Sequence, residues 1–142
     1  RPIPAESTMI HHISDRDVRD APVLEEVLLE VADFICDSVL VGHHVSFDIR
    51  FLNKTLRKQL LCHLKHPWID TMLLYLLRTG QVGHYSLEEV AAHCQVEIRQ
   101  RHTAHGDALA AAQVFARLTQ HLADDDRPLQ ALIDSQHELG LF

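Results

Sequence analysis

The sequence predicts one α/β domain, and three observations favour that fold class. Segments with helical apolar periodicity alternate with a strand-like run, the order expected when helices cover a largely parallel sheet. The strand-like run, residues 38–42, is almost entirely apolar and ends at a glycine, which is typical of a strand buried on both faces. At 142 residues with 46% hydrophobic content, the chain is long enough to bury a core.

The first part of the chain contains two predicted helices that flank this strand. Two prolines within residues 1–4 predict an extended start. Residues 22–35 place apolar side chains at helical spacing after an aspartate and a proline, which are both helix start signals. From Ser46 the helical pattern returns, with a basic face that we interpret as solvated or as steering phosphate. The basic face consists of Arg50, Lys54, Arg57 and Lys58.

The middle of the chain predicts a short extended segment and two further helices. Pro67 predicts a break, followed by an extended segment up to Asp70, which we interpret as a cap or a structural acceptor. The helix after it is expected to end at Gly80. Ser86 begins the next helix, because Glu89 completes a capping box with it.

The last part of the chain predicts one long helix and an extension. Residues 106–123 are helical in pattern, with Ala108, Ala111, Phe115, Leu118 and Leu122 on one face. We assign residues 1–123 to one domain and residues 124–142 to a helical extension or the start of a linker. The extension could pack on the domain, pair with another subunit or lead to a fused domain.

The composition excludes some functions and leaves others open. A formal charge of −7 argues against a large basic surface that coats duplex nucleic acid. It does not argue against a nuclease, because bound divalent cations supply positive charge where phosphate must lie. The chain has three cysteines and no CxxC pair, so we expect reduced thiols rather than disulfides or a zinc site. Without a long apolar run or a signal-peptide pattern, we expect a cytoplasmic protein that does not insert into membranes.

Two aspartates stand in the first turn of predicted helices. Asp48 follows the strand and its loop, and Asp107 follows His102 by five residues. Carboxylates at such junctions bind Mg²⁺ or Mn²⁺ through oxygen, and a nearby histidine can take a proton from metal-bound water. Each aspartate taken alone fits a helix cap at least as well, because its charge meets the positive end of the helix dipole. The residues by themselves leave both interpretations open.

Several stretches in the same order resemble one enzyme family. "HHVSFDIRFLN", residues 43–53, is similar to the second exonuclease motif of the DnaQ-like 3′→5′ exonucleases, and "HTAHGDALAAAQVF", residues 102–115, to the third. The third motif has the histidine form called DEDDh, and the family includes the proofreading epsilon subunit of bacterial DNA polymerase III. "RPIPAESTMIHHIS", "WIDTMLL" and "SLEEVAAHCQV" match further family segments. The resemblance covers residues 1–123 and implies an RNase H-like α/β fold, of which this chain would be the C-terminal two-thirds.

The resemblance also implies an activity and roles for named residues. Asp48 and Asp107 correspond to metal ligands and His102 to the general base, working with two divalent cations, Mg²⁺ or Mn²⁺. The implied reaction hydrolyses phosphodiester bonds at the 3′ ends of single-stranded or frayed DNA or RNA, with DNA favoured, and releases nucleoside monophosphates. A DNA polymerase or a fused domain is the implied protein partner. Substrate contacts are expected from His43, His44, Phe47 and Arg101.

The chain departs from the family pattern at three places. His44 stands where the family usually has asparagine, and His12 stands where it usually has glycine. The first motif, an Asp-x-Glu pair on the first strand that supplies the other two acidic ligands, has no counterpart in these residues. We therefore expect that motif and the N-terminal strands to lie upstream of Arg1 in a longer protein, without which the chain alone would be inactive.

Two function classes other than an exonuclease are alternatives for this chain. If the first motif is truly lost, the alternative is a non-catalytic nuclease-like module used for binding or assembly. An α/β domain that binds a small molecule through a glycine-rich phosphate loop has no sequence support, because the chain contains neither GxGxxG nor GKS/T.

Overall fold

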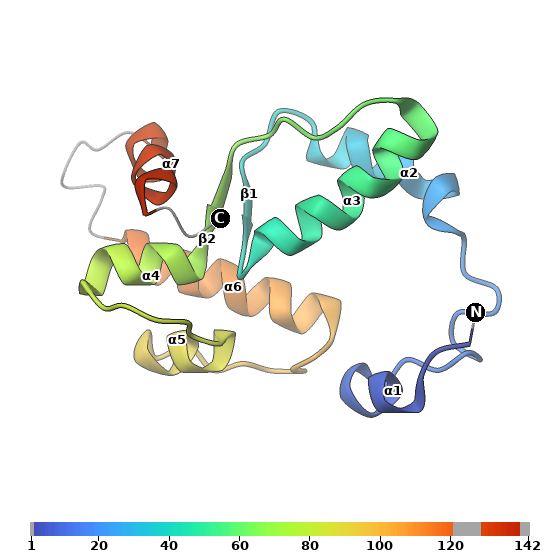
Figure 1. Ribbon diagram of the computed structural model, residues 1–142. Coiled ribbons are helices and arrows are strands. Elements are labelled where there is room, and N and C mark those ends of the chain that lie inside the picture. The colour runs from blue at the N-terminus through green and yellow to red at the C-terminus, as the bar shows by residue number, and fades with distance from the viewer. Residues whose placement is uncertain (1, 121–128, 140–142) are drawn as a thin grey trace.

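The computed structural model describes residues 2–120 and 129–139, and these residues combine helices with a small sheet (Figure 1). The strands lie near the middle of the molecule, and helices surround them. This arrangement confirms the α/β class. In chain order the elements are α1 (Ala5–His11), α2 (Leu24–Ile35), β1 (Leu40–Gly42), α3 (Val45–Leu60), β2 (Trp68–Asp70), α4 (Thr71–Thr79), α5 (Leu87–His93), α6 (Ala104–Thr119) and α7 (Leu129–Glu138).

The two strands pair in parallel. Leu40 pairs with Trp68 and Gly42 with Asp70, so the carboxyl ends of both strands lie at one edge of the sheet. At that edge the chain enters α3 after β1 and α4 after β2. Val41 is 37% exposed, so the expected burial of this strand on both faces is not reached in the described part of the chain.

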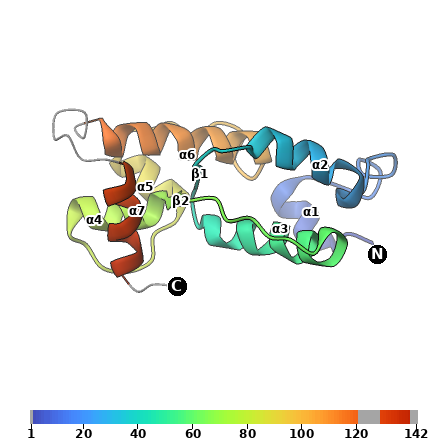
Figure 2. The same ribbon diagram turned by 90° about the horizontal axis from the view of Figure 1, so that it is seen from above.

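The main core lies where α4, α5 and α6 meet β2 and α7. Helix α4 is apolar on nearly all sides, and its residues 71–76 are buried because α6 and α7 both pack against it (Figure 2). Gly80 ends α4 in the left-handed conformation at φ 67°, which confirms the expected glycine stop. The fully buried apolar side chains of this core include Ile69, Leu74, Val90 and Val114.

The buried face of α6 agrees with the expected one only in part, because Ala111 and Leu118 are buried as expected but other members are not. The expected face began at Ala108, which is exposed, and Phe115 is half-buried; Leu122 lies outside the described residues. In a helix with many small residues, the periodicity of the sequence hardly determines which face is buried. The packing of α4, α5 and β1 against α6 determines it instead. The structure buries Gly106, Ala110, Ala111, Val114 and Leu118.

A second group of helices forms the N-terminal side of the molecule. Helix α2 packs on α3 through buried Leu28, Ile35 and Leu56, while α1 has no buried residue. The extended start expected from the two prolines holds for residues 2–4 only, because a helix begins directly after Pro4. Proline is tolerated at a helix start, since the missing N–H has no partner there in any case. The basic face of α3 is exposed, as expected: Arg50, Lys54, Arg57 and Lys58.

Helix α7 packs against α4 and β2, which is one of the three positions considered for the C-terminal segment. Ile133 enters the main core. Gln136 is 1% exposed, and its Oε1 accepts a hydrogen bond of 2.7 Å from the backbone N–H of Asp70. A side chain of α7 therefore satisfies a backbone donor at the carboxyl end of β2. The acidic run at residues 124–126 lies outside the described residues.

The described residues also bear on membrane insertion and on cysteine chemistry. No helix in the described ranges has both the length and the apolar character needed to cross a membrane. Cys36, Cys62 and Cys94 all lie within those ranges and are free.

Asp70 joins the sheet edge to two helices, and its replacement should destabilise the fold. The side chain is 3% exposed, its Oδ2 accepts the N–H of Val45 at 3.0 Å, and its Oδ1 accepts the N–H of Met72 at 3.0 Å. Asp70→Ala would leave both donors without this partner, and we expect a loss of about 2–4 kcal/mol in the free energy of unfolding by urea titration. Asp17→Ala, which removes an exposed cap on Ser14, is the control and should cost about 1 kcal/mol or less. Equal effects of the two variants would contradict this role of Asp70.

Candidate active site

Two histidine positions that depart from the family pattern have left-handed backbone conformations. His12 ends α1 at φ 61°, and His44 precedes α3 at φ 56°. Glycine adopts this region freely, and asparagine and histidine are enriched there among other residues. The substitutions therefore keep residue types that tolerate the required backbone.

His43 is tied into the structure through both ring nitrogens. Its Nδ1 lies 2.9 Å from Oγ1 of Thr71, and its Nε2 lies 3.0 Å from the carbonyl oxygen of Tyr85. The Tyr85 oxygen can only accept, so Nε2 carries the proton, and burial lowers the pKa of the ring, which favours the neutral form. Nδ1 then accepts from the Thr71 hydroxyl. His43 thus links the end of β1 to α4 and to the loop before α5, and its role toward substrate stays a prediction.

His44 lies in a small stack of imidazole rings. Its ring is 4.4 Å from that of His84 with nearly parallel planes, and 4.6 Å from that of His43 in an edge-to-face arrangement. Its Nε2 is buried without a hydrogen-bond partner in the described part of the chain. The ring holds the loop before α5 against the start of α3.

Asp48 and Phe47 occupy the first turn of α3, where both side chains are exposed. Partial desolvation raises the pKa of the Asp48 carboxyl, and the like charge of Asp70 adds to this, while the backbone N–H of Asp48 opposes it. Such a carboxylate would gain from a nearby cation. Phe47 is 67% exposed and so is not packed within the described residues.

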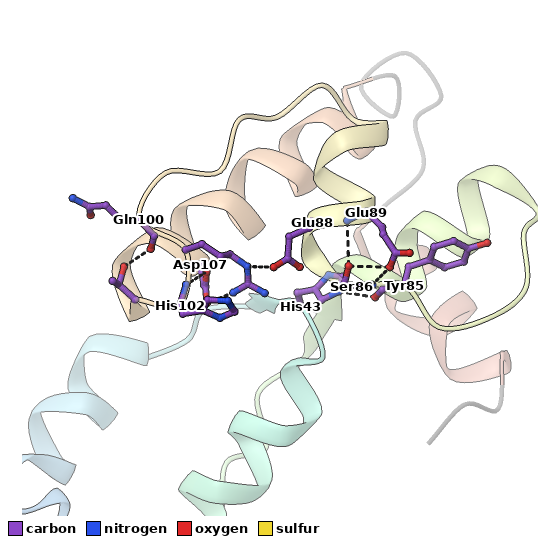
Figure 3. Close-up of polar contacts among 10 residues, drawn as sticks. His43, Tyr85, Ser86, Glu88, Glu89, Gln100, His102 and Asp107 are labelled. Atoms are coloured by element: carbon purple, nitrogen blue, oxygen red, sulfur yellow. Dashed lines mark hydrogen bonds and ion pairs between the residues drawn. The ribbon is translucent and has the colours of Figure 1, made fainter. Parts of the chain in front are cut away.

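Asp107 lies in the first turn of α6, at the other predicted junction. Thr103 caps this helix, because its Oγ1 accepts the N–H of Gly106 at 3.0 Å. The Asp107 Oδ1 accepts the backbone N–H of His102 at 3.2 Å, and its Oδ2 accepts Nη1 of Arg101 at 2.6 Å. In Figure 3, Gln100, His102, Asp107 and Glu88 follow one another from the loop before α6 to the start of α5. Both carboxylate oxygens are therefore occupied by donors.

Arg101 and His102 complete this corner of the molecule. The Arg101 guanidinium also donates through Nε to Glu88 in the first turn of α5, and this hydrogen bond lowers the pKa of Glu88 to about 2. His102 has φ 64°, and its side chain is exposed. The structure thus places the expected general base beside one expected metal ligand, with the ring free to reach solvent or substrate.

Gly106 is required by the close approach of the loop before α6. A Cβ at this position would lie 2.2 Å from the carbonyl oxygen of Gln100 and 2.5 Å from that of Arg99. Gly106→Ala should therefore destabilise the protein by about 1–3 kcal/mol in a urea titration, because backbone must shift. Helix propensity alone predicts the opposite sign, since alanine is favoured over glycine by about 1 kcal/mol. A Gly106→Ala variant that is more stable than the wild type would show that the loop before α6 leaves room for a Cβ at this position.

Asp48 and Asp107 carry the donor atoms expected of the predicted metal site. The oxygens of Asp48 and Asp107 are the ligand type that Mg²⁺ and Mn²⁺ prefer. Within residues 2–120 and 129–139, no group of three or more histidine, cysteine, aspartate or glutamate side chains is placed to hold a metal ion. The donor chemistry of these two carboxylates fits a hard divalent cation, but two carboxylates alone do not complete such a site.

The fold and this corner together define the class of the protein. The two parallel strands, with α3 and α4 beginning at their carboxyl ends, fit an RNase H-like α/β domain. The chain belongs to the exonuclease family, because the family model described as Exonuclease (RNase T) matches residues 1–115.

Relatives with polymerase names support the same family. The chain is 38% identical over 122 residues to a DNA polymerase III subunit epsilon-like protein of Rhodobacter capsulatus, covering 83% of this chain and 17% of that protein. It is 31% identical over 123 residues to a PolC-type DNA polymerase III of Caldanaerobacter subterraneus, covering 87% of this chain and 9% of that protein. The PolC-type protein of Staphylococcus epidermidis is 31% identical over 113 residues, or 80% of this chain and 8% of that protein. The chain thus spans less than a fifth of the length of these relatives.

Sequence reasoning missed Glu88 as a member of the site. It is 13 residues from Arg101, and no periodicity connects the two positions. The cap at Thr103 had a usable signal, since a threonine stands directly before the helical pattern. No sequence signal indicated that Asp70 binds the starts of both α3 and α4, because Val45 in α3 is 25 residues away.

Proposed function

We propose that the protein containing this chain is a metal-dependent 3′→5′ exonuclease. It hydrolyses phosphodiester bonds at the 3′ ends of single-stranded or frayed nucleic acid, DNA in preference to RNA, and releases nucleoside monophosphates. The observation that carries this proposal is the hydrogen bond of 3.2 Å from the His102 backbone N–H to Asp107, which holds a carboxylate and an exposed imidazole at one helix start. Membership of the exonuclease family and relatives named as DNA polymerase III support it.

Each residue of the site has a distinct task in the proposed reaction. Asp48 and Asp107 would hold divalent cations, Mg²⁺ or Mn²⁺, together with acidic residues outside the described set. When bound, two such cations supply positive charge to the attacking and leaving oxygens of a phosphodiester. His102 takes a proton from the attacking water, for which its exposed ring is suited. The buried bonds of Asp70 fix the helix start from which Asp48 projects.

The proposed substrate is unpaired nucleic acid. The exposed ring of Phe47 offers a face on which a base can stack, a contact that does not depend on base identity. His43 and His44 form part of the loop next to Phe47. Because the net charge of the chain is −7, bound metal cations would supply the positive charge that attracts the phosphate. A DNA polymerase or a fused domain as partner, a cytoplasmic location, and residues 1–123 as the exonuclease-like domain are parts of the same proposal.

The direction and the metal requirement can be tested in one assay. The complete protein is incubated with single strands labelled at the 3′ or the 5′ end, with Mg²⁺, with Mn²⁺ or with EDTA. We expect labelled mononucleotides at the earliest times from the 3′-labelled strand, a shortening ladder from the 5′-labelled strand, and no release in EDTA. Release that persists in EDTA, or mononucleotides first from the 5′ end, would overturn the proposal. Strand binding without cleavage in either metal would instead support a non-catalytic nuclease-like module.

A further inference from the structure

One guanidinium connects two carboxylates that lie on different helices. Arg101 donates through Nη1 to Asp107 of α6 at 2.6 Å and through Nε to Glu88 of α5. Figure 3 labels the two carboxylates, Asp107 and Glu88. The exposed side-chain fractions are 29% for Arg101, 33% for Asp107 and 47% for Glu88, so the group is partly shielded from water. The two carboxylates use different nitrogens of the same guanidinium, so one contact can break while the other remains.

The Arg101 contact covers an atom that a metal ion would need. The Asp107 Oδ1 already accepts the His102 N–H, and the guanidinium occupies Oδ2. A divalent cation bound at Oδ2 would lie close to the positive guanidinium, and like charges at such distances repel appreciably in a partly shielded site. The cation and Nη1 of Arg101 therefore compete for the same oxygen.

We propose that Arg101 is a positioning residue whose guanidinium binds Asp107 until a divalent cation replaces it there. The guanidinium then keeps only its contact with Glu88. The proposal rests on the function proposed above, in which Asp107 binds the metal. In the metal-free protein Arg101 keeps the Asp107 carboxylate oriented and neutralises it. Glu88 retains the displaced guanidinium, so that Asp107 becomes free without loss of a partner for Arg101.

Variants of the two partners should change metal affinity in opposite directions. Arg101→Gln removes the competitor, and we expect Mn²⁺ to bind about 3- to 5-fold more tightly, the upper part of the range of a partly exposed ion pair. Glu88→Gln removes the alternative partner, so the guanidinium stays on Asp107 and Mn²⁺ should bind more weakly by a similar factor. With both substitutions the Glu88 change should have no further effect, because no guanidinium remains to be retained.

The experiment is a titration of the complete protein with Mn²⁺, in which the electron paramagnetic resonance signal of the free ion reports binding without any turnover. Arg99→Gln is the control for Arg101→Gln, and Glu89→Gln is the control for Glu88→Gln. Each makes the same charge change on the same loop or helix, but neither residue contacts the Arg101 guanidinium in the structure. Both should alter the Mn²⁺ affinity by less than about twofold. Asp107→Asn should weaken binding most strongly.

The outcomes separate this inference from the proposed function. Opposite shifts for the two single variants and no Glu88 effect in the double variant would support the exchange. Shifts in the same direction, additive effects, or equal shifts in the control variants would overturn it, even if the protein cleaves 3′ ends. A wild-type protein that binds no Mn²⁺, or binding unchanged in Asp107→Asn, would overturn both the metal site and this inference.

Discussion

Replacing Asp48 or Asp107 with asparagine in the complete protein is expected to reduce mononucleotide release from a 3′-labelled strand by more than about 10²-fold. Even groups that only orient metal ligands typically contribute about 10- to 100-fold, so loss of a ligand should exceed that. Asparagine keeps the size of the side chain but removes the negative charge that a hard cation requires. Initial rates at saturating Mg²⁺ and Mn²⁺ would measure the effect.

The interpretation depends on a preserved fold. Asp48 is exposed, so Asp48→Asn should leave the thermal unfolding midpoint nearly unchanged, while Asp107→Asn also weakens the contact with Arg101. Asp33→Asn changes an exposed carboxylate on α2 and should retain full activity. If both Asp48→Asn and Asp107→Asn cleave at the wild-type rate, the two junctions are helix caps and the assignment as metal ligands is wrong.

His102→Ala is expected to slow the reaction by about 10²- to 10⁴-fold if the imidazole is the general base. The effect should appear in kcat with KM nearly unchanged, because the ring is assigned to proton transfer rather than to substrate binding. The backbone N–H that His102 donates to Asp107 remains in the alanine variant, so the carboxylate keeps this donor. Steady-state kinetics on a single strand would separate the two parameters.

A second variant of His102 is needed to separate the effect of its backbone conformation from the effect of its ring. His102 has φ 64°, where alanine is strained and asparagine is tolerated. His102→Asn should therefore fold as well as the wild type and still lose activity to the same extent. His105→Ala replaces an exposed histidine three residues further along the chain; it is the control and should change kcat by no more than a few-fold. Recovery of activity in His102→Asn would assign the loss to the loop rather than to the proton transfer.

Local chemistry explains why most element boundaries could be predicted. Ser86 and Glu89 form the expected capping box at the start of α5, and Gly80 ends α4 in the expected left-handed conformation. Each of these signals needs only neighbours within one helical turn. The same holds for the placement of Asp48 and Asp107, which both lie in the first turn of a helix as expected.

Predictions failed or stayed open where the phase of a helix or a distant partner mattered. Helix α1 after Pro4 was not foreseen, because the prolines that disfavour a helix interior are tolerated at its start. The buried face of α6 could not be fixed from the pattern of an alanine-rich helix, in which Ala108 and Ala110 look alike. The position of α7 depended on Gln136 and its bond to Asp70, 66 residues away.

The sequence by itself determined the α/β class, the family, and the positions of Asp48, His102 and Asp107 at helix starts, because caps and short motifs act over a few residues. The tertiary structure decided which groups meet across the chain. It brought Arg101 into contact with Glu88, and it placed the carboxylate of Asp70 where it accepts a hydrogen bond from the start of α3. These contacts depend on how helices pack around the strands, and a periodic pattern contains no information on which polar groups that packing brings together.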